Sequence, residues 1–95
     1  MSDTPILKLY MVECIDTDLL PDVYDVYIKF VICAESAEEA RNTHPNGYYG
    51  IGGGWNDEVD SWIRYSQRDK LAVDEIGTAS ANAKKRVVVT SFNNG

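Results

Sequence analysis

The chain has 95 residues, a length that suits one domain with its own hydrophobic core, so we expect residues 1–95 to form a single domain. Its 15 acidic and 9 basic residues give a net charge of −6, which disfavours general binding to nucleic-acid phosphates because that binding needs an excess of Lys and Arg. The first residues lack a signal-peptide pattern and no apolar run approaches the roughly 20 residues that cross a bilayer, so we expect a cytoplasmic protein without membrane contact.

Two segments near the N-terminus have the composition of strands. The first, residues 6–14, alternates apolar and polar side chains, and the second, residues 24–34, is rich in Val, Ile, Tyr and Phe. A turn that contains Pro21 separates them, so we predict that they pair as a hairpin. Cys14 and Cys33 lie in these apolar segments, and we expect buried thiols in preference to a disulfide bridge or a metal ligand.

A short helix of about two turns is predicted after the second strand. Ser36 and Glu39 have the spacing of a capping box, in which the Ser hydroxyl accepts the Glu39 N–H and the Glu39 side chain reaches back to the Ser36 backbone. Pro45 stops the helix because a residue before proline disfavours the helical conformation. His44, the single histidine, is expected to cap the last helical carbonyl groups in preference to a catalytic role, and no two-histidine metal site is possible.

The second half of the chain is predicted to hold another short helix and two strands. Asp57 is placed to cap a helix whose apolar stripe is formed by Val59, Trp62 and Ile63. Residues 71–76 and 86–92 have strand composition, and the basic run at 84–86 is expected at the solvated end of a hairpin between them. The order β-β-α-(α)-β-β predicts an α+β domain in which a helix packs on one face of an antiparallel sheet of about four strands.

Residues 46–55 hold five of the seven glycines and three of the ten aromatic residues. Their spacing matches neither the dinucleotide-binding fingerprint nor a Walker phosphate loop, and no Lys or Arg lies between Arg41 and Arg64. Tyr, Trp, Gly and Asn are frequent at protein-recognition surfaces. Two interpretations remain open: the aromatic side chains contact a partner, or they fold back onto the sheet edge while the glycines permit the turn.

Acidic residues are concentrated in the first part of the chain. Residues 1–60 contain 3 basic and 12 acidic residues, a net charge of −9, whereas residues 61–95 contain 6 basic and 3 acidic residues, a net charge of +3. This acidic charge is interpreted first as a means of keeping the protein soluble, and second as suited to a partner with a basic surface. Asp57, Glu58 and Asp60 are interpreted first as dipole-compatible residues of a first helical turn, ahead of an acid–base pair or a weak metal site.

Several short motifs occur in a fixed order outside the glycine-rich segment: Tyr24-Asp25, Ala34-Glu35-Ser36, Glu39-Ala40-Arg41, His44-Pro45, Trp62, Ile76-Gly77-x-Ala79 and Ser91-Phe92-Asn93-Asn94-Gly95. In this order they resemble a group of small, mostly uncharacterised proteins encoded by bacteriophages. Related sequences tend to end in Ser-Phe-Asn-Ala-Gly, so Asn94 is a departure. The resemblance implies a phage or prophage accessory protein in the host cytoplasm, such as an anti-CRISPR protein or another inhibitor of host defence.

The leading hypothesis is a non-enzymatic protein that binds and inhibits a host protein or nucleoprotein complex with a basic surface. It needs no cofactor or metal and no direct contact with nucleic acid. The candidate contacts come from the glycine-rich segment, its acidic neighbours and the C-terminus: Tyr48, Tyr49, Trp55, Asp57, Glu58, Asp60, Asn93 and Asn94.

Two other hypotheses concern a ligand and the oligomeric state. The alternative function is a small-molecule or nucleotide-binding module, with or without weak hydrolytic activity, whose pocket lies between the glycine-rich segment and the sheet. The chain is expected to be a monomer or a homodimer, and a homodimer is expected to join along an open strand edge such as residues 87–92.

Overall fold

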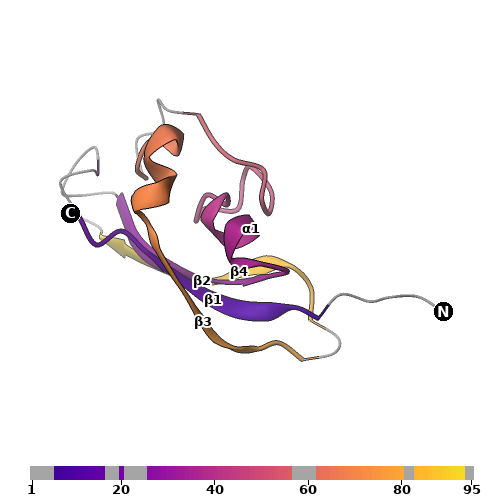
Figure 1. Ribbon diagram of the computed structural model, residues 1–95. Coiled ribbons are helices and arrows are strands. Elements are labelled where there is room, and N and C mark those ends of the chain that lie inside the picture. Colours follow the sequence, from indigo (N-terminus) through magenta and orange to yellow (C-terminus); the bar gives the residue numbers. More distant parts are fainter. Residues whose placement is uncertain (1–5, 17–19, 21–25, 57–61, 81–82, 94–95) are drawn as a thin grey trace.

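The computed structural model describes residues 6–16, 20, 26–56, 62–80 and 83–93, without the side chains of residues 92 and 93. It contains a four-stranded antiparallel sheet, an α-helix and a 3-10 helix, and both helices lie over the same face of the sheet (Figure 1). The predicted α+β architecture is therefore confirmed. The elements are β1 (Lys8–Glu13), β2 (Val26–Ala34), α1 (Ala37–Arg41), η2 (Tyr65–Lys70), β3 (Ala72–Thr78) and β4 (Arg86–Asn93).

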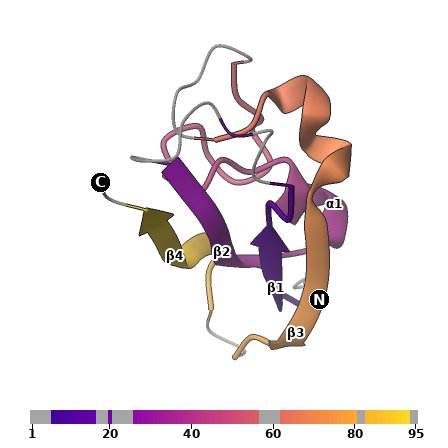
Figure 2. The ribbon, with the colours of Figure 1, turned by 90° about the vertical axis from the view of Figure 1, so that its left-hand side faces the viewer.

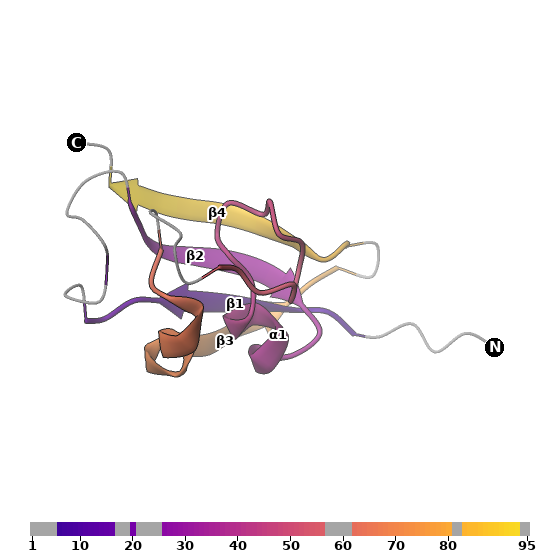
Figure 3. The same ribbon diagram turned by 90° about the horizontal axis from the view of Figure 1, so that it is seen from above.

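The strand order is β3-β1-β2-β4, so the two strands that come last in the chain lie at opposite edges of the sheet (Figures 2 and 3). β1 and β2 pair antiparallel as predicted, with Met11 opposite Val31. β3 pairs with β1, and β4 pairs with β2. The expected hairpin between the last two strands is wrong, because each strand adds to a different edge of the central pair. β1 and β2 are thus hydrogen-bonded on both sides.

The core lies between the helix-bearing face of the sheet and the segments above it. Alternate residues of the central strands supply its floor, and Phe30 meets the Trp62 ring edge to face with centroids 5.8 Å apart. The buried cluster is formed by Tyr10, Val12, Cys14, Phe30, Ile32, Ala34, Ala40, Trp55, Trp62, Ile63 and Leu71. Cys14 and Cys33 are both buried and free, as predicted. Burial and the nearby carboxylates of Asp16 and Glu13 raise the pKa of the Cys14 thiol to about 11, so this thiol stays protonated at neutral pH.

α1 is shorter than predicted, and its N-terminal cap differs in one detail. The Ser36 hydroxyl accepts the Glu39 N–H at 3.1 Å, as expected for a capping box. The Glu39 carboxylate instead accepts the N–H of Glu35, at 2.9 Å, one residue before the expected partner. The helix ends at Arg41, because the chain turns at Asn42 before it reaches Pro45.

The helix predicted after the glycine-rich segment falls partly on residues 57–61, which lie outside the described residues. Trp62 and Ile63, the described members of its apolar stripe, are buried in the core but are not helical. The helix that is described, η2, begins later, at Tyr65, and buries none of its residues. Within the described ranges, neither helix has the length and apolar character that crossing a bilayer requires.

Candidate functional site

The glycine loop, defined here as residues 46–54, follows α1 and folds through consecutive turns over the helix-bearing side of the molecule (Figure 1). The Gly47 N–H donates to the His44 carbonyl at 3.0 Å, Gly50 to Gly47 at 3.2 Å, and Gly53 to Gly50 at 3.2 Å. Left-handed φ angles of 72° to 81° occur at four positions, Gly47, Gly50, Gly52 and Gly54. Side chains other than hydrogen are unfavourable at such angles. The clustering of glycine is therefore explained by the path of the backbone.

Thr43 attaches the glycine loop to the end of α1. Its buried hydroxyl donates to the Glu39 carbonyl at 2.8 Å and accepts the Gly52 N–H at 2.7 Å. The Gly54 N–H donates to the Asn42 carbonyl at 2.7 Å. Carbonyl groups at a helix C-terminus lack partners within the helix, so these bonds stabilise the helix end and the loop together.

The N–H groups of the glycine loop are directed into the protein. In addition to the bonds above, the Tyr48 N–H donates to the side-chain oxygen of Asn46 at 2.7 Å. Residues 47, 48, 50, 52, 53 and 54 therefore all donate their N–H groups to protein acceptors. A phosphate cradle needs several converging N–H groups that point at the anion. The backbone of this loop is thus unsuited to hold a phosphate.

His44 lies beneath the glycine loop and is almost fully buried, with 1% of its surface exposed. Its Nδ1 accepts the Asn46 N–H at 3.1 Å, and its ring lies 5.4 to 5.9 Å from the rings of Tyr27, Tyr49 and Trp55. Burial lowers the pKa of His44 to about 4, against the smaller upward effect of its hydrogen bond with Asn46. His44 is therefore neutral at pH 7.

The capping role expected for His44 is replaced by a role in the core. A neutral imidazole has no charge with which to complement the negative end of a helix dipole. The side chain that contacts a C-terminal helical carbonyl is the one before it, because the Thr43 hydroxyl donates to Glu39. The sequence contained this signal, since a Thr four residues after a helical residue can bond back to that residue's carbonyl group.

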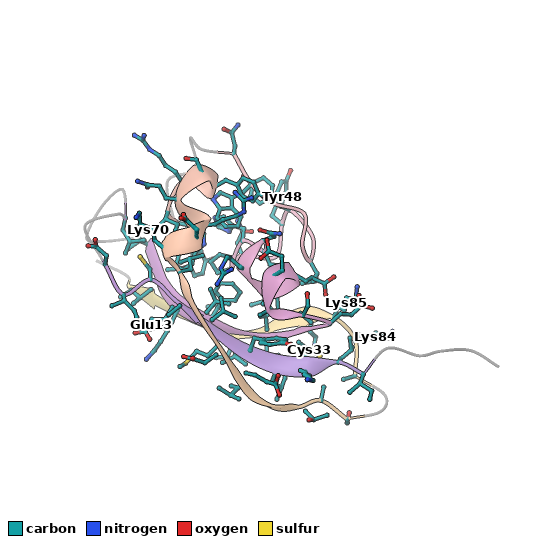
Figure 4. All side chains as sticks on the ribbon, in the orientation of Figure 1. Glu13, Cys33, Tyr48, Lys70, Lys84 and Lys85 are labelled. Atoms are coloured by element: carbon teal, nitrogen blue, oxygen red, sulfur yellow. The ribbon has the colours of Figure 1, made fainter. Side chains whose placement is uncertain are left out.

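A continuous series of aromatic rings runs from the tip of the glycine loop, residues 47–50, to η2. Adjacent centroids are 5.3 Å apart for Tyr48 and Tyr49, 5.4 Å for Tyr49 and His44, 5.9 Å for His44 and Trp55, and 4.9 Å for Trp55 and Tyr65. The tip of the series is exposed: 83% of the Tyr48 surface and 38% of the Tyr49 surface are accessible. Figure 4 shows Tyr48 on the side of the molecule away from the sheet.

Trp55 belongs to the core and not to the exposed surface. Its exposed fraction is 8%, and its indole N–H donates to the Ile63 carbonyl at 2.7 Å. The two interpretations of the segment thus hold for different residues, since Trp55 folds back onto the protein while Tyr48 faces solvent. Its burial corrects the expectation that Trp55 contacts a partner, and Trp55 is not part of the candidate surface.

One of the remaining predicted contacts, Asn93, lies in the described part of the chain. Asp57, Glu58, Asp60 and Asn94 lie outside the described residues. Asn93 ends β4, where its backbone is paired with Val26.

The uneven charge along the sequence does not become two separate surfaces at the described positions. Lys85 lies 3.1 Å from a Glu39 oxygen and 3.3 Å from a Glu35 oxygen, and these hydrogen-bonded carboxylates raise its pKa. Lys8 pairs with Glu75 at 3.2 Å. Both contacts join the acidic and basic parts of the chain. Figure 4 shows Lys85 beside α1, so this residue of the basic run contacts the helix instead of ending a hairpin.

A polar groove between α1 and η2 has no counterpart among the sequence predictions. It encloses about 380 Å³ and is lined by Glu38, Arg41, Ser66, Arg68 and Asp69. Arg41 contacts Glu38 at 3.4 Å, and the Arg68 guanidinium donates to Asn42 at 2.8 Å. Two guanidinium groups are thus accompanied by two carboxylates, so the groove has no excess charge. Sequence reasoning missed it because η2 has neither a side-chain cap nor an apolar stripe.

The described residues contain no group of three or more His, Cys, Asp or Glu side chains placed to hold a metal ion. Comparison with protein-family models, with curated proteins and with solved structures found no match to this chain. The geometry of the glycine loop is therefore the structural feature from which a function is inferred.

Proposed function

We propose that this chain is a non-enzymatic binding protein that contacts a partner protein through the tip of its glycine loop. The observation that carries the proposal is the exposed pair of Tyr48 and Tyr49, whose rings meet edge to face 5.3 Å apart. Tyrosine supplies a large amphipathic contact with few rotatable bonds, and it is enriched among the residues that dominate binding energy at interfaces.

The base of the loop supports this proposal because it fixes the tip before any partner binds. Thr43 holds the loop to α1, and Tyr49 rests against the buried ring of His44 at 5.4 Å. A preorganised contact loses less conformational entropy on binding than one that must be ordered. The Tyr48 ring is therefore displayed on a backbone that already has its turns formed.

The partner that we propose is a protein with a basic surface. Aromatic faces attract Lys and Arg side chains, and Glu38 on the neighbouring helix keeps about 65% of its side chain exposed. The resemblance to phage-encoded proteins extends the proposal to a host defence complex, which an anti-CRISPR or related inhibitor would occupy. The support for that extension is the resemblance itself.

A capture experiment with matched variants tests the proposal. The wild-type protein, Tyr48→Ala with Tyr49→Ala, and Ile76→Ala are immobilised separately and exposed to a bacterial lysate, and bound proteins are identified by mass spectrometry. Ile76 is also a large exposed apolar residue, but it lies on β3. We expect a protein captured by the wild type and by Ile76→Ala to be depleted at least tenfold by the double tyrosine variant, since hot-spot residues are worth about 2 kcal/mol or more.

One result of this experiment would contradict the proposal. If every protein that the wild type captures is also retained by the double tyrosine variant, the tip is not the binding surface. Thermal unfolding of all three proteins is measured alongside, so that loss of capture is interpreted only for variants that remain folded.

A further inference from the structure

The second face of the sheet is open in the described part of the chain. Both helices and the glycine loop lie over the other face (Figure 1). The centre of this open face is apolar, because the register places Met11, Val31 and Val89 side by side across three strands. Val89 is 57% exposed, and the groove that these residues help to line has a volume of about 190 Å³. A soluble domain gains free energy by covering such a surface.

Charged residues divide the open face into two halves of opposite sign. Glu13 on β1 and Asp74 on β3 make one half acidic, whereas Lys29 on β2 and Arg86 on β4 make the other half basic. Glu13 and Lys29 stand opposite each other in the register, one on each side of the line between the two central strands. The apolar centre lies across that same line.

This distribution is self-complementary under a twofold rotation. If the axis runs parallel to the strands, between β1 and β2, the rotation places β1 of one copy over β2 of another. Glu13 then faces Lys29 of the second copy, and Met11 faces Val31 of the second copy. A twofold interface needs each contact to be matched by its reciprocal, and this face meets that condition.

We propose that two copies of this chain pair through their open faces to form a two-sheet sandwich. Sheets packed in this way keep their strands nearly aligned and bury both inner faces about 10 Å apart. A second copy fits this surface better than an unrelated partner, because charges of opposite sign already occupy positions related by the axis. The glycine loops lie on the outer sides of such a dimer, so each dimer presents two copies of the loop tip that carries Tyr48 and Tyr49.

Pairing along the strand edges is less favourable than pairing through the faces. Both edge strands depart from regular register. The pairing of β3 shifts between Leu9 and Tyr10 of β1, and the pairing of β4 shifts twice along β2, between Tyr27 and Lys29 and between Val31 and Ile32. Bulges at sheet edges hinder the addition of another strand.

Charge reversal tests the proposed pairing directly. For the wild type, static light scattering is expected to give twice the mass of one chain. Glu13→Lys alone, or Lys29→Glu alone, is expected to raise the dissociation constant of the dimer at least tenfold. Each single variant would place like charges opposite each other. A one-to-one mixture of the two variants should recover the dimer mass, because in the mixed pair Lys at position 13 faces Glu at position 29 and the reciprocal contact is Glu facing Lys.

The mixture shows whether the charge effect acts between chains or within one chain. Each variant still has like charges at positions 13 and 29 of its own chain after mixing, so a recovered dimer mass can come only from contacts between chains. Lys8→Glu is the matched control: it reverses a charge of β1 on the other face, where Lys8 contacts Glu75, and should leave the mass unchanged. Val89→Asp provides a second variant at an exposed position and should give a monomer. The proposal is overturned if the wild type is monomeric, if the dimer persists in both charge variants and in Val89→Asp, or if folded charge variants stay monomeric when mixed.

Discussion

The tip (residues 47–50) and the base (residues 52–55) of the glycine-rich segment both contain glycine and aromatic residues, but these residues serve different purposes in the two parts. At Gly47 and Gly50, in the tip, an added Cβ would meet nothing within 4 Å. At Gly53, in the base, it would overlap the carbonyl oxygen of Tyr49, and at Gly54 it would come within 3.1 Å of the Tyr65 ring. Glycine is thus required by backbone angle alone at Gly47 and Gly50, by close packing at Gly53, and by both at Gly54.

The aromatic residues show the same division. Tyr48 projects from the tip, whereas Trp55 closes the core at the end of the base. From composition alone, both the tip and the base resemble a recognition surface. Their contacts in the folded protein differ, so substitutions in the base should change the stability of the fold and substitutions at the tip should change partner binding.

The largest effect is expected for Trp55→Ala. The substitution removes a buried ring that contacts His44 and Tyr65, and it leaves the Ile63 carbonyl without its indole donor. We expect the free energy of unfolding to fall by about 3–5 kcal/mol, as measured by urea denaturation. Trp55→Phe keeps most of the apolar area and should cost less. A loss below about 1 kcal/mol for Trp55→Ala would contradict the assignment of this residue to the core.

A pH dependence of stability is expected from His44, at the boundary between tip and base. Its pKa is about 4 in the folded protein against an ordinary value of 6.5, so between these pH values the unfolded chain binds a proton that the folded chain does not. The free energy of unfolding should therefore fall by about 3 kcal/mol as the pH drops through this window, and His44 should contribute no slope above it. Urea denaturation from pH 4 to pH 7 measures this.

His44→Phe isolates this contribution, because it keeps an aromatic ring at the same place but cannot be protonated. The variant should show a shallower dependence of unfolding free energy on pH than the wild type. Equal slopes would mean that the histidine is not held neutral by burial. All other ionisable groups are the same in the two proteins, so the difference between their slopes reports on His44.

A moderate effect is expected for Thr43→Val at the attachment of the base. The substitution keeps the shape of the side chain but removes the hydroxyl that joins Glu39 and Gly52. A buried donor or acceptor left without a partner costs about 1–3 kcal/mol, so we expect a loss in that range by urea denaturation. Thr43→Ser retains the hydroxyl and should be closer to the wild type. If the serine and valine variants are equally destabilised, the hydrogen bonds are not the reason that threonine is needed.

The fold was predictable where local patterns determine it. Alternation of apolar residues indicated β1, the Val- and Ile-rich runs indicated β2 and β4, and Ser36 fixed the start of α1. The order of the strands was not predictable in this way, because the choice of edge for β3 and β4 depends on contacts distant in sequence. The polar residues of η2 likewise give no periodic signal, since that helix buries none of them.

The candidate site was predictable only in its location. The sequence indicates that the glycines bend the backbone, but it does not distinguish Trp55 from Tyr48, which are both large aromatic residues next to glycine. The difference between them is a hydrogen bond from the Trp55 indole to the Ile63 carbonyl. The position of that carbonyl is set only once the chain has folded. The histidine was misassigned for a similar reason, since its burial depends on rings from β2 and from the loop.

The smallest effect on stability is expected for Tyr48→Ala, and it is the sharpest test of the division between tip and base. With 83% of its surface exposed, this ring buries little area, so the free energy of unfolding should change by no more than about 0.5 kcal/mol. Tyr49→Ala should cost more, because its ring also contacts His44. Urea denaturation of both variants beside Trp55→Ala gives the order Tyr48, Tyr49, Trp55 in increasing loss. If Tyr48→Ala costs as much as the buried substitutions, the tip also belongs to the core, and its tyrosines cannot be a surface that is kept for a partner.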